Sequence, residues 1–158
     1  MVCNIEYSNQ TSAQKINLGR INKMHSSGYF KHAKNMSKMS DFHRSHIGCV
    51  VVYKNKIIGT GFNSSKTHPI QRVYNRVRFE CDQTPHTLHS EIHALCPLMD
   101  STDINWSKAH VYVYREHKNG VRAMARPCPS CMRFIKDLGI KNIHYTTEDG
   151  FADETLDI

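Results

Sequence analysis

The chain has 158 residues, of which 39% are apolar, a share typical of a single globular domain and too high for a disordered chain. Its 21 lysine and arginine residues outnumber 14 acidic ones and give a formal charge of +7. No apolar run reaches the ~18–20 residues that a membrane helix needs, so we expect a cytoplasmic protein without a membrane partner.

The first half of the chain predicts an arm, a helix and a hairpin. Residues 1–27 are polar and without period, and we assign them to an N-terminal arm. Apolar residues recur at helical spacing from Tyr29 onwards, and the β-branched segment His46–Tyr53 is typical of a buried strand. Ile57–Phe62 follows after a tight turn as its hairpin partner. We expect the polar segment Asn63–Pro85 to form a long loop.

The second half alternates between helices and strands. The predicted helices are Leu88–Met99 and Pro127–Leu138, and the predicted strands are Ala109–Arg115 and Lys141–Thr147. A hairpin followed by this alternation predicts an α/β fold, a three-layer α/β/α sandwich around a mixed sheet of four to five strands. We place the domain at residues 28–150 and assign residues 151–158 to an acidic tail.

Two short segments of the second half contain potential metal ligands. Cys128 and Cys131 are three residues apart, so one metal ion can bind both from the first turn of a helix. With His89 as a third ligand, the fourth position of a zinc ion stays open for water, as in catalytic zinc sites. Glu91 is then placed to move the protons of the reaction. The same CxxC spacing also occurs in redox pairs and in halves of structural zinc sites.

The chain has further cysteines and histidines. Six cysteines without a secretion signal indicate reduced thiols or metal ligands rather than disulfides. His93, four residues after His89, could chelate the same ion. A second zinc site could use Cys49, Cys81, His68 and His86. Hydrogen-bonded histidines and a buried cysteine are the interpretation that we favour for these residues.

The sequence resembles the cytidine and deoxycytidylate deaminase superfamily over about residues 28–150. The matching segments are Gly61-Phe62-Asn63, His89-Ser90-Glu91 and Pro127-Cys128-Pro129-Ser130-Cys131. The resemblance implies Zn²⁺ as the cofactor on His89, Cys128 and Cys131, with Glu91 as the proton shuttle. It also implies that Asn63 hydrogen-bonds the sugar or base of the substrate. Ser90 replaces the alanine more usual in the family, and its backbone N–H can still bind the pyrimidine carbonyl.

The resemblance also implies the reaction. A zinc hydrolase of this kind replaces the exocyclic amine of a cytosine with oxygen, forming uracil and releasing ammonia. We favour a free nucleotide such as dCMP as the substrate. The alternatives are cytosine or adenine in single-stranded DNA or RNA and, more remotely, a non-catalytic zinc module that binds nucleic acid. A homo-oligomer is compatible with the sequence.

The uneven charge of the chain indicates an anionic partner. Residues 1–79 contain 13 basic and 2 acidic side chains, whereas residues 80–158 contain 8 basic and 12 acidic ones. We expect Lys66, His68 and Arg72, in the loop after Asn63, to contact the substrate's sugar and phosphate. The alternative is that these side chains are solvated and only keep the loop soluble. This loop lacks the family's usual glycines, and the short tail suggests that the family's fifth strand and last helix are missing.

Overall fold

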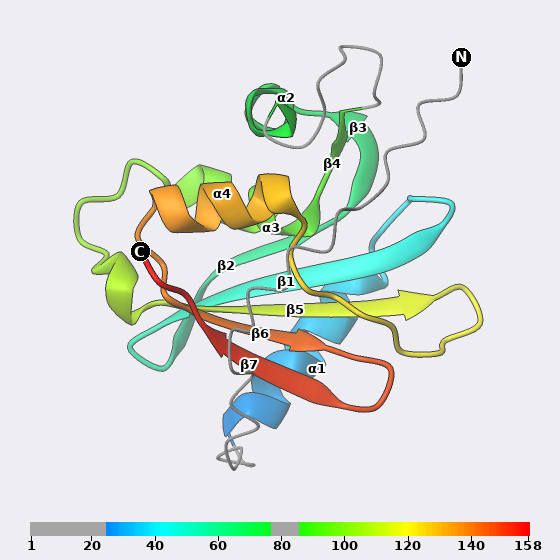
Figure 1. The fold of residues 1–158 in the computed structure, drawn as a ribbon. Coiled ribbons are helices and arrows are strands. Elements are labelled where there is room, and N and C mark those ends of the chain that lie inside the picture. Colours follow the sequence, from blue (N-terminus) through cyan, green and yellow to red (C-terminus); the bar gives the residue numbers. More distant parts are fainter. Residues whose placement is uncertain (1–24, 77–85) are drawn as a thin grey trace.

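The computed structural model describes residues 25–76 and 86–158 and contains one five-stranded sheet (Figure 1). The strands lie in the order β2-β1-β5-β6-β7. Their bounds are Ser45–Tyr53 for β1, Lys56–Phe62 for β2, His110–His117 for β5, Asn142–Thr146 for β6 and Phe151–Thr155 for β7. β1 pairs antiparallel with β2 and β5, β5 pairs parallel with β6, and β6 pairs antiparallel with β7. The sheet is therefore mixed, as predicted.

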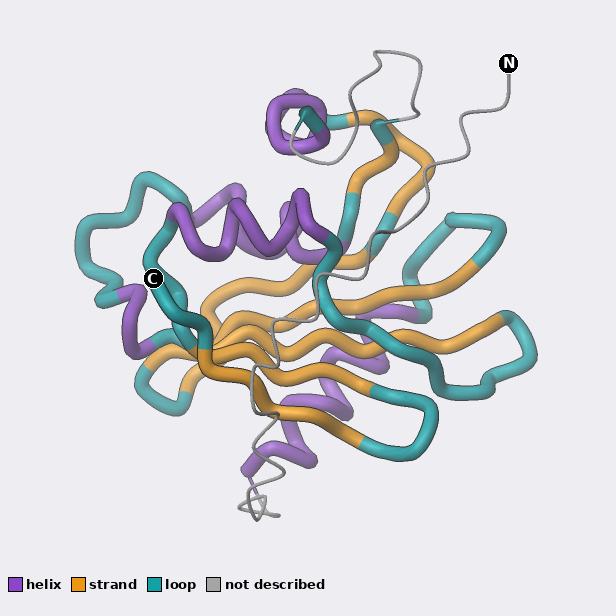
Figure 2. Tube along the Cα trace, in the orientation of Figure 1, coloured by secondary structure: helices purple, strands orange, loops and turns teal. Residues whose placement is uncertain are grey.

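Helices cover both faces of this sheet and confirm the three-layer sandwich. Helix α1 (His25–Ser37) crosses one face, while α3 (Ser90–Leu95) and α4 (Pro129–Asp137) lie on the other, as the tube in Figure 2 shows. Two 3-10 helices complete this layer at its edge, η1 (Cys96–Leu98) directly after α3 and η2 (Trp106–Lys108) before β5. None of the helices in the described segments has the length and apolarity to span a membrane.

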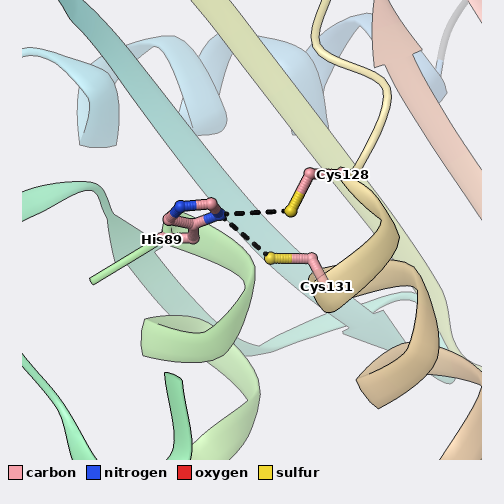
Figure 3. Close-up of side chains that lie close together, drawn as sticks. All are labelled: His89, Cys128 and Cys131. Atoms are coloured by element: carbon pink, nitrogen blue, oxygen red, sulfur yellow. Dashed lines mark hydrogen bonds between the residues drawn. The ribbon is translucent and has the colours of Figure 1, made fainter. Parts of the chain in front are cut away.

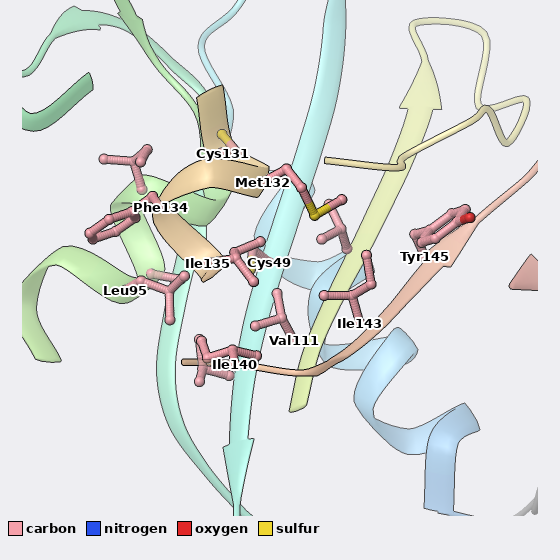
Figure 4. Close-up of a cluster of buried hydrophobic side chains, with 14 of the residues drawn as sticks. Cys49, Leu95, Val111, Cys131, Met132, Phe134, Ile135, Ile140, Ile143 and Tyr145 are labelled. Atoms are coloured by element: carbon pink, nitrogen blue, oxygen red, sulfur yellow. The ribbon is translucent and has the colours of Figure 1, made fainter. Parts of the chain in front are cut away.

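The larger of two cores lies between the sheet and the helices α3 and α4 (Figure 4). Side chains alternate along a strand, so Val111 and Val113 of β5 enter this core, while Tyr112 and Tyr114 pack under α1. Phe134 of α4 is among the largest side chains in the larger core. Burial of such a side chain stabilises the fold by about 1.5–3 kcal/mol. This packing fixes α4, and with it the N-terminus of α4, over the sheet.

The prediction of a long loop at Asn63–Pro85 is wrong, because much of this segment has regular structure. The elements in and next to it are β3 (Ser64–Thr67), α2 (Pro69–Asn75) and β4 (Thr87–Leu88), which pairs with β3. The α2 helix begins after His68, whose Nδ1 accepts a hydrogen bond from the backbone N–H of Ile70, and proline takes its first position. Residues 77–85 lie outside the described residues.

The predicted ends of the domain also change. Residues 151–158 are not merely an acidic tail, because Phe151–Thr155 form β7, the fifth strand that we expected to be missing. A hairpin back from β6 needs only the short connection 147–150, so no further helix is required. At the other end, α1 begins at His25, inside the predicted arm. The rest of that arm, residues 1–24, lies outside the described residues.

Candidate active site

Three potential metal ligands meet where the helices α3 and α4 begin. His89 is the residue that precedes α3, Cys128 is the residue that precedes α4, and Cys131 lies in the first turn of α4. The His89 Nδ1 atom lies 3.4 Å from the Sγ of Cys128 and 3.3 Å from the Sγ of Cys131 (Figure 3). In the described residues this is the one group of three His, Cys, Asp or Glu side chains close enough to share an ion.

The local sequence explains why these helices begin where they do. Pro129 occupies the first turn of α4, where its missing N–H costs nothing, and Cys128 before it has an extended backbone. The start of α3 is held against β2 at Gly61, where an added Cβ would lie 2.4 Å from the carbonyl oxygen of Ser90. Only a glycine permits this close approach of helix and strand.

The donor set fits a zinc ion. Tetrahedral zinc with its usual bonds to nitrogen and sulfur separates these two ligand atoms by about 3.5 Å. The two N–S distances in the site, 3.4 and 3.3 Å, are close to that value. The thiol of Cys131 donates a hydrogen bond that, with the neighbouring His89, lowers the pKa of Cys128 to about 3. Burial raises the pKa of Cys131.

Glu91 is a buried carboxyl group beside these ligands. Its side chain is 5% exposed and accepts a hydrogen bond of 2.9 Å from the hydroxyl of Ser90. Burial raises the pKa of Glu91, an effect that the His89 ring and the Ser90 hydroxyl oppose. A carboxyl group with a raised pKa can accept and return a proton near neutral pH.

Glu91, His89 and Cys128 open into a cleft of about 550 Å³, a size that suits a small-molecule ligand. Its lining from the main sheet consists of Ser45 and Ile47 at the start of β1 and Arg115 near the end of β5. Its other lining residues are Phe42, His43, Arg44, Asn75, Thr87, Met124, Ala125 and Arg126. Two of the three predicted ligands, His89 and Cys128, thus share one cleft with the predicted proton shuttle.

The five residues that we predicted to contact the substrate lie in different parts of the fold. Ser90 is fully buried, with its hydroxyl on Glu91. The amide of Asn63 is engaged with β1, since its Oδ1 accepts from the N–H of Ile47 and its Nδ2 donates to the Ser45 carbonyl, both at 2.8 Å. Asn63 therefore positions two residues that line the cleft.

The remaining three predicted contacts belong to β3 and α2. Lys66 and Arg72 are exposed, and His68 caps α2. None of the three is among the described residues that line the cleft. Their role in binding the substrate's sugar and phosphate stays a prediction.

Cys49 is buried, and His68, His86 and His93 are hydrogen-bonded, which agrees with the interpretation that we favoured for these four residues. Cys49 is fully buried in the larger core, and burial raises its pKa. His93 faces β2, where its Nδ1 lies 2.9 Å from the backbone oxygen of Phe62. Cys81 lies outside the described residues.

A series of hydrogen-bonded polar side chains supports the backbone of His89, and the sequence does not predict it. The backbone N–H of His89 donates a hydrogen bond of 3.0 Å to Oε1 of Gln71. The Gln71 amide donates in turn to Asn75 at 2.9 Å, and the Asn75 amide donates to Nδ1 of His86 at 3.0 Å. Gln71 and Asn75 are spaced four residues apart on α2, and this spacing is the only sequence signal for the series of hydrogen bonds. The burial of two amides in a polar segment could not be predicted.

From the sequence, Arg115 and Arg126 are alternative phosphate-binding residues, but the sequence does not predict that they line one cleft with Arg44 and His43. His43 and Arg44 come from the connection between α1 and β1, Arg115 comes from β5, and Arg126 precedes α4. Arg126 forms an ion pair of 2.7 Å with Glu154 of β7. These positions are far apart in the sequence, and only the sheet register brings them together.

Comparison with known proteins matches the sequence to a protein family. The family model described as "Cytidine and deoxycytidylate deaminase zinc-binding region" matches residues 24–147. No curated protein sequence matches the chain.

Solved structures share the fold at low sequence identity. The dCMP deaminase of the cyanophage S-TIM5 in apo form is 24% identical, with a TM-score of 0.55, over 77% of this chain and 82% of the other. Its complex with dCMP and dUMP aligns at 20% identity and a TM-score of 0.56, over 80% and 83%. Cytidine deaminase from Burkholderia pseudomallei is 13% identical, with a TM-score of 0.56, over 82% and 91%.

Proposed function

The chain belongs to the cytidine and deoxycytidylate deaminase family, and on that basis we propose that it hydrolyses the exocyclic amine of a cytosine nucleotide such as dCMP. The observation that carries this proposal is the shared cleft of His89, Cys128 and the buried carboxyl of Glu91. In the overall reaction one water adds to the cytosine ring and one ammonia leaves, so that uracil is formed.

His89, Cys128 and Cys131 would hold the zinc ion. The ion supplies a water whose lowered pKa makes it a nucleophile near pH 7. The three side chains come from the starts of two packed helices, so their positions do not depend on a flexible loop. The Gln71 amide anchors the backbone of His89 from the α2 side. The protein thereby keeps the ligand atoms in place before the ion binds.

Glu91 would carry the protons. As a carboxylate it would accept one proton from the attacking water, and as a carboxylic acid it would pass that proton to the ring nitrogen. It would then accept the second proton of the same water oxygen and pass it to the amine, which leaves as ammonia. Burial favours the protonated form, while the Ser90 hydroxyl favours the carboxylate, and the balance suits a group that must do both. A buried carboxyl without such a task would only destabilise the fold.

A free nucleotide is the substrate that the cleft supports best. Its volume of about 550 Å³ suits a molecule of that size, and its cationic lining suits a phosphate. Single-stranded DNA or RNA remains the alternative, because the first half of the chain is strongly basic. The buried Glu91 disfavours a non-catalytic zinc module, which has no use for it.

A substrate panel tests the proposal. Zinc-loaded protein would be incubated with cytidine, dCMP, dCTP, single-stranded DNA and tRNA, and both ammonia and the deaminated base would be measured. We expect equimolar ammonia and uracil product, with dCMP giving the highest kcat/KM. Deamination of a polynucleotide with none of dCMP would favour the alternative substrate. Inosine in the tRNA sample would show adenine as the base, and no product from any substrate would contradict a deaminase.

A further inference from the structure

We infer that Arg115 forms the subsite for the phosphomonoester of the nucleotide, an inference that rests on the proposed function. Arg115 lies near the end of β5, opposite Ile47 of β1 in the sheet register. Alternation along β5 places it on the same face as Val111 and Val113, the face that α3 and α4 cover. Both Arg115 and Ile47 line the cleft that contains Glu91.

The guanidinium of Arg115 has unused donors. Its Nε is buried and has no hydrogen-bond partner in the described residues. Its Nη1 makes one long hydrogen bond, 3.4 Å, to the carbonyl oxygen of Met124. A guanidinium has five N–H donors, and a buried donor without an acceptor is unfavourable. Because Arg115 lines the cleft, an anion bound there would supply acceptors to this guanidinium.

Arg115 and Arg126 both line the cleft, but only Arg126 is paired with an acidic side chain in the described residues. Arg126 is neutralised by Glu154, to which it donates two hydrogen bonds of 2.8 and 2.7 Å. Arg115 takes part in none of the ion pairs of the described residues. It is therefore a half-buried cation without a counter-charge, at the edge of a site that takes a nucleotide. Arg44 adds positive charge from the connection before β1.

This arrangement fits a phosphomonoester better than a neutral sugar. The planar guanidinium offers parallel N–H donors that match two oxygens of one phosphate. The proton-transfer group and metal ligands belong to the layer of α3 and α4, whereas Arg115 belongs to the sheet and His43 and Arg44 to a loop. A nucleotide likewise carries its base and phosphate at different ends. The subsite would thus select a nucleotide over a nucleoside.

Kinetics on two substrates test this assignment. We compare kcat/KM for dCMP and for deoxycytidine in the wild type, in Arg115→Gln and in Arg115→Lys. Loss of a charge-assisted hydrogen-bond pair should lower the dCMP-to-deoxycytidine ratio about ten- to a hundredfold in Arg115→Gln, with partial recovery in Arg115→Lys. Arg133→Gln is the matched control, because Arg133 is an exposed arginine paired with Asp137 on α4, and it should keep the wild-type ratio.

Binding measurements separate this inference from the proposed function. Calorimetry with dCMP and deoxycytidine on zinc-loaded Glu91→Gln protein needs no turnover. We expect dCMP to bind more tightly, and the added Arg115→Gln change to remove that difference. If the Arg115→Gln change left the difference in affinity between dCMP and deoxycytidine unchanged, the subsite would be overturned. Loss of that difference in Arg72→Gln instead would also overturn it. Equal loss of affinity for a single-stranded oligonucleotide without a terminal phosphate would overturn the phosphomonoester in favour of a strand backbone.

Discussion

The backbone N–H of His89 donates its hydrogen bond to the side chain of Gln71, a fully buried residue on a different helix. The bond joins α2 to the start of α3. The proposed metal ligand His89 is therefore anchored by a helix that lies along the chain between the two strands of the small sheet, β3 and β4, and not by the five-stranded sheet. Groups behind a metal ligand keep it oriented and contribute to metal affinity. The α2 helix therefore has a direct bearing on the site.

Removing this anchor should weaken the metal site. In Gln71→Met the N–H of His89 loses its acceptor while the volume is nearly kept. We expect about tenfold weaker zinc affinity and a loss of roughly 1–3 kcal/mol in the free energy of unfolding. Competition with a chromogenic chelator measures the first quantity and urea unfolding the second. The exposed Val73→Ala on the same helix is the control, and equal zinc affinity in the two variants would show that α2 does not support His89.

Close packing at Gly61 makes a second prediction. A Cβ there would lie 2.4 Å from the carbonyl oxygen of Ser90 and 2.5 Å from the backbone nitrogen of Ala94, so Gly61→Ala must displace α3 from β2. We expect a loss of about 1–3 kcal/mol in stability together with reduced zinc content. Gly28→Ala is the matched control on α1, because no atom lies within 4 Å of its added Cβ. Equal stability of both variants would refute the close approach.

The Ser90 hydroxyl should set the pH dependence of the reaction. Burial raises the pKa of Glu91, and the hydrogen bond from Ser90 lowers it because it favours the carboxylate. Ser90→Ala removes this bond, so the pKa of Glu91 should rise. The acid limb of the kcat/KM profile should then move to higher pH, while zinc content stays the same. A limb that stays in place, or moves to lower pH, would mean that Glu91 is not the group that titrates there.

The ion pair between β7 and the cleft predicts a pH-dependent stability. The hydrogen bond from Arg126 lowers the pKa of Glu154 in the folded protein, so the pair stabilises the fold above the unfolded pKa of about 4.3. This contribution is lost as the pH falls from there towards the folded pKa. Glu154→Gln should cost about 0.5–1 kcal/mol at pH 7 and little at pH 3. Unfolding curves at both pH values check this, and a difference that persists at pH 3 would contradict it.

Local patterns explain which parts of the molecule could be predicted. The β-branched segment before Tyr53 predicted β1, and Lys54 and Asn55 adopt the left-handed backbone, with φ of 49° and 61°, that its tight turn requires. The spacing of Cys128 and Cys131 predicted a shared metal site, and the structure brings both thiols close to His89 at the start of α4. Such features depend on residues close in sequence.

Other features depend on long-range packing and were missed. Gln71 and Asn75 are polar, so nothing in their local sequence shows that α2 buries them. The acidic segment at Asp153 and Glu154 resembles a solvated tail, yet backbone pairing with β6 makes it a strand. Arg115 joins the cleft only through its register with β1. The positions of cationic residues around the cleft therefore needed the structure.

The most direct test of the central claim is product formation by the zinc-loaded Glu91→Gln variant. The account predicts that this variant keeps its zinc and its unfolding temperature. The rate at which it forms ammonia and dUMP from dCMP should fall by about 10²–10⁴-fold, because the group that carries the protons is gone. Glu148→Gln, which changes an exposed carboxylate, should match the wild type. Turnover of dCMP by zinc-bound Glu91→Gln at close to the wild-type rate would contradict the account.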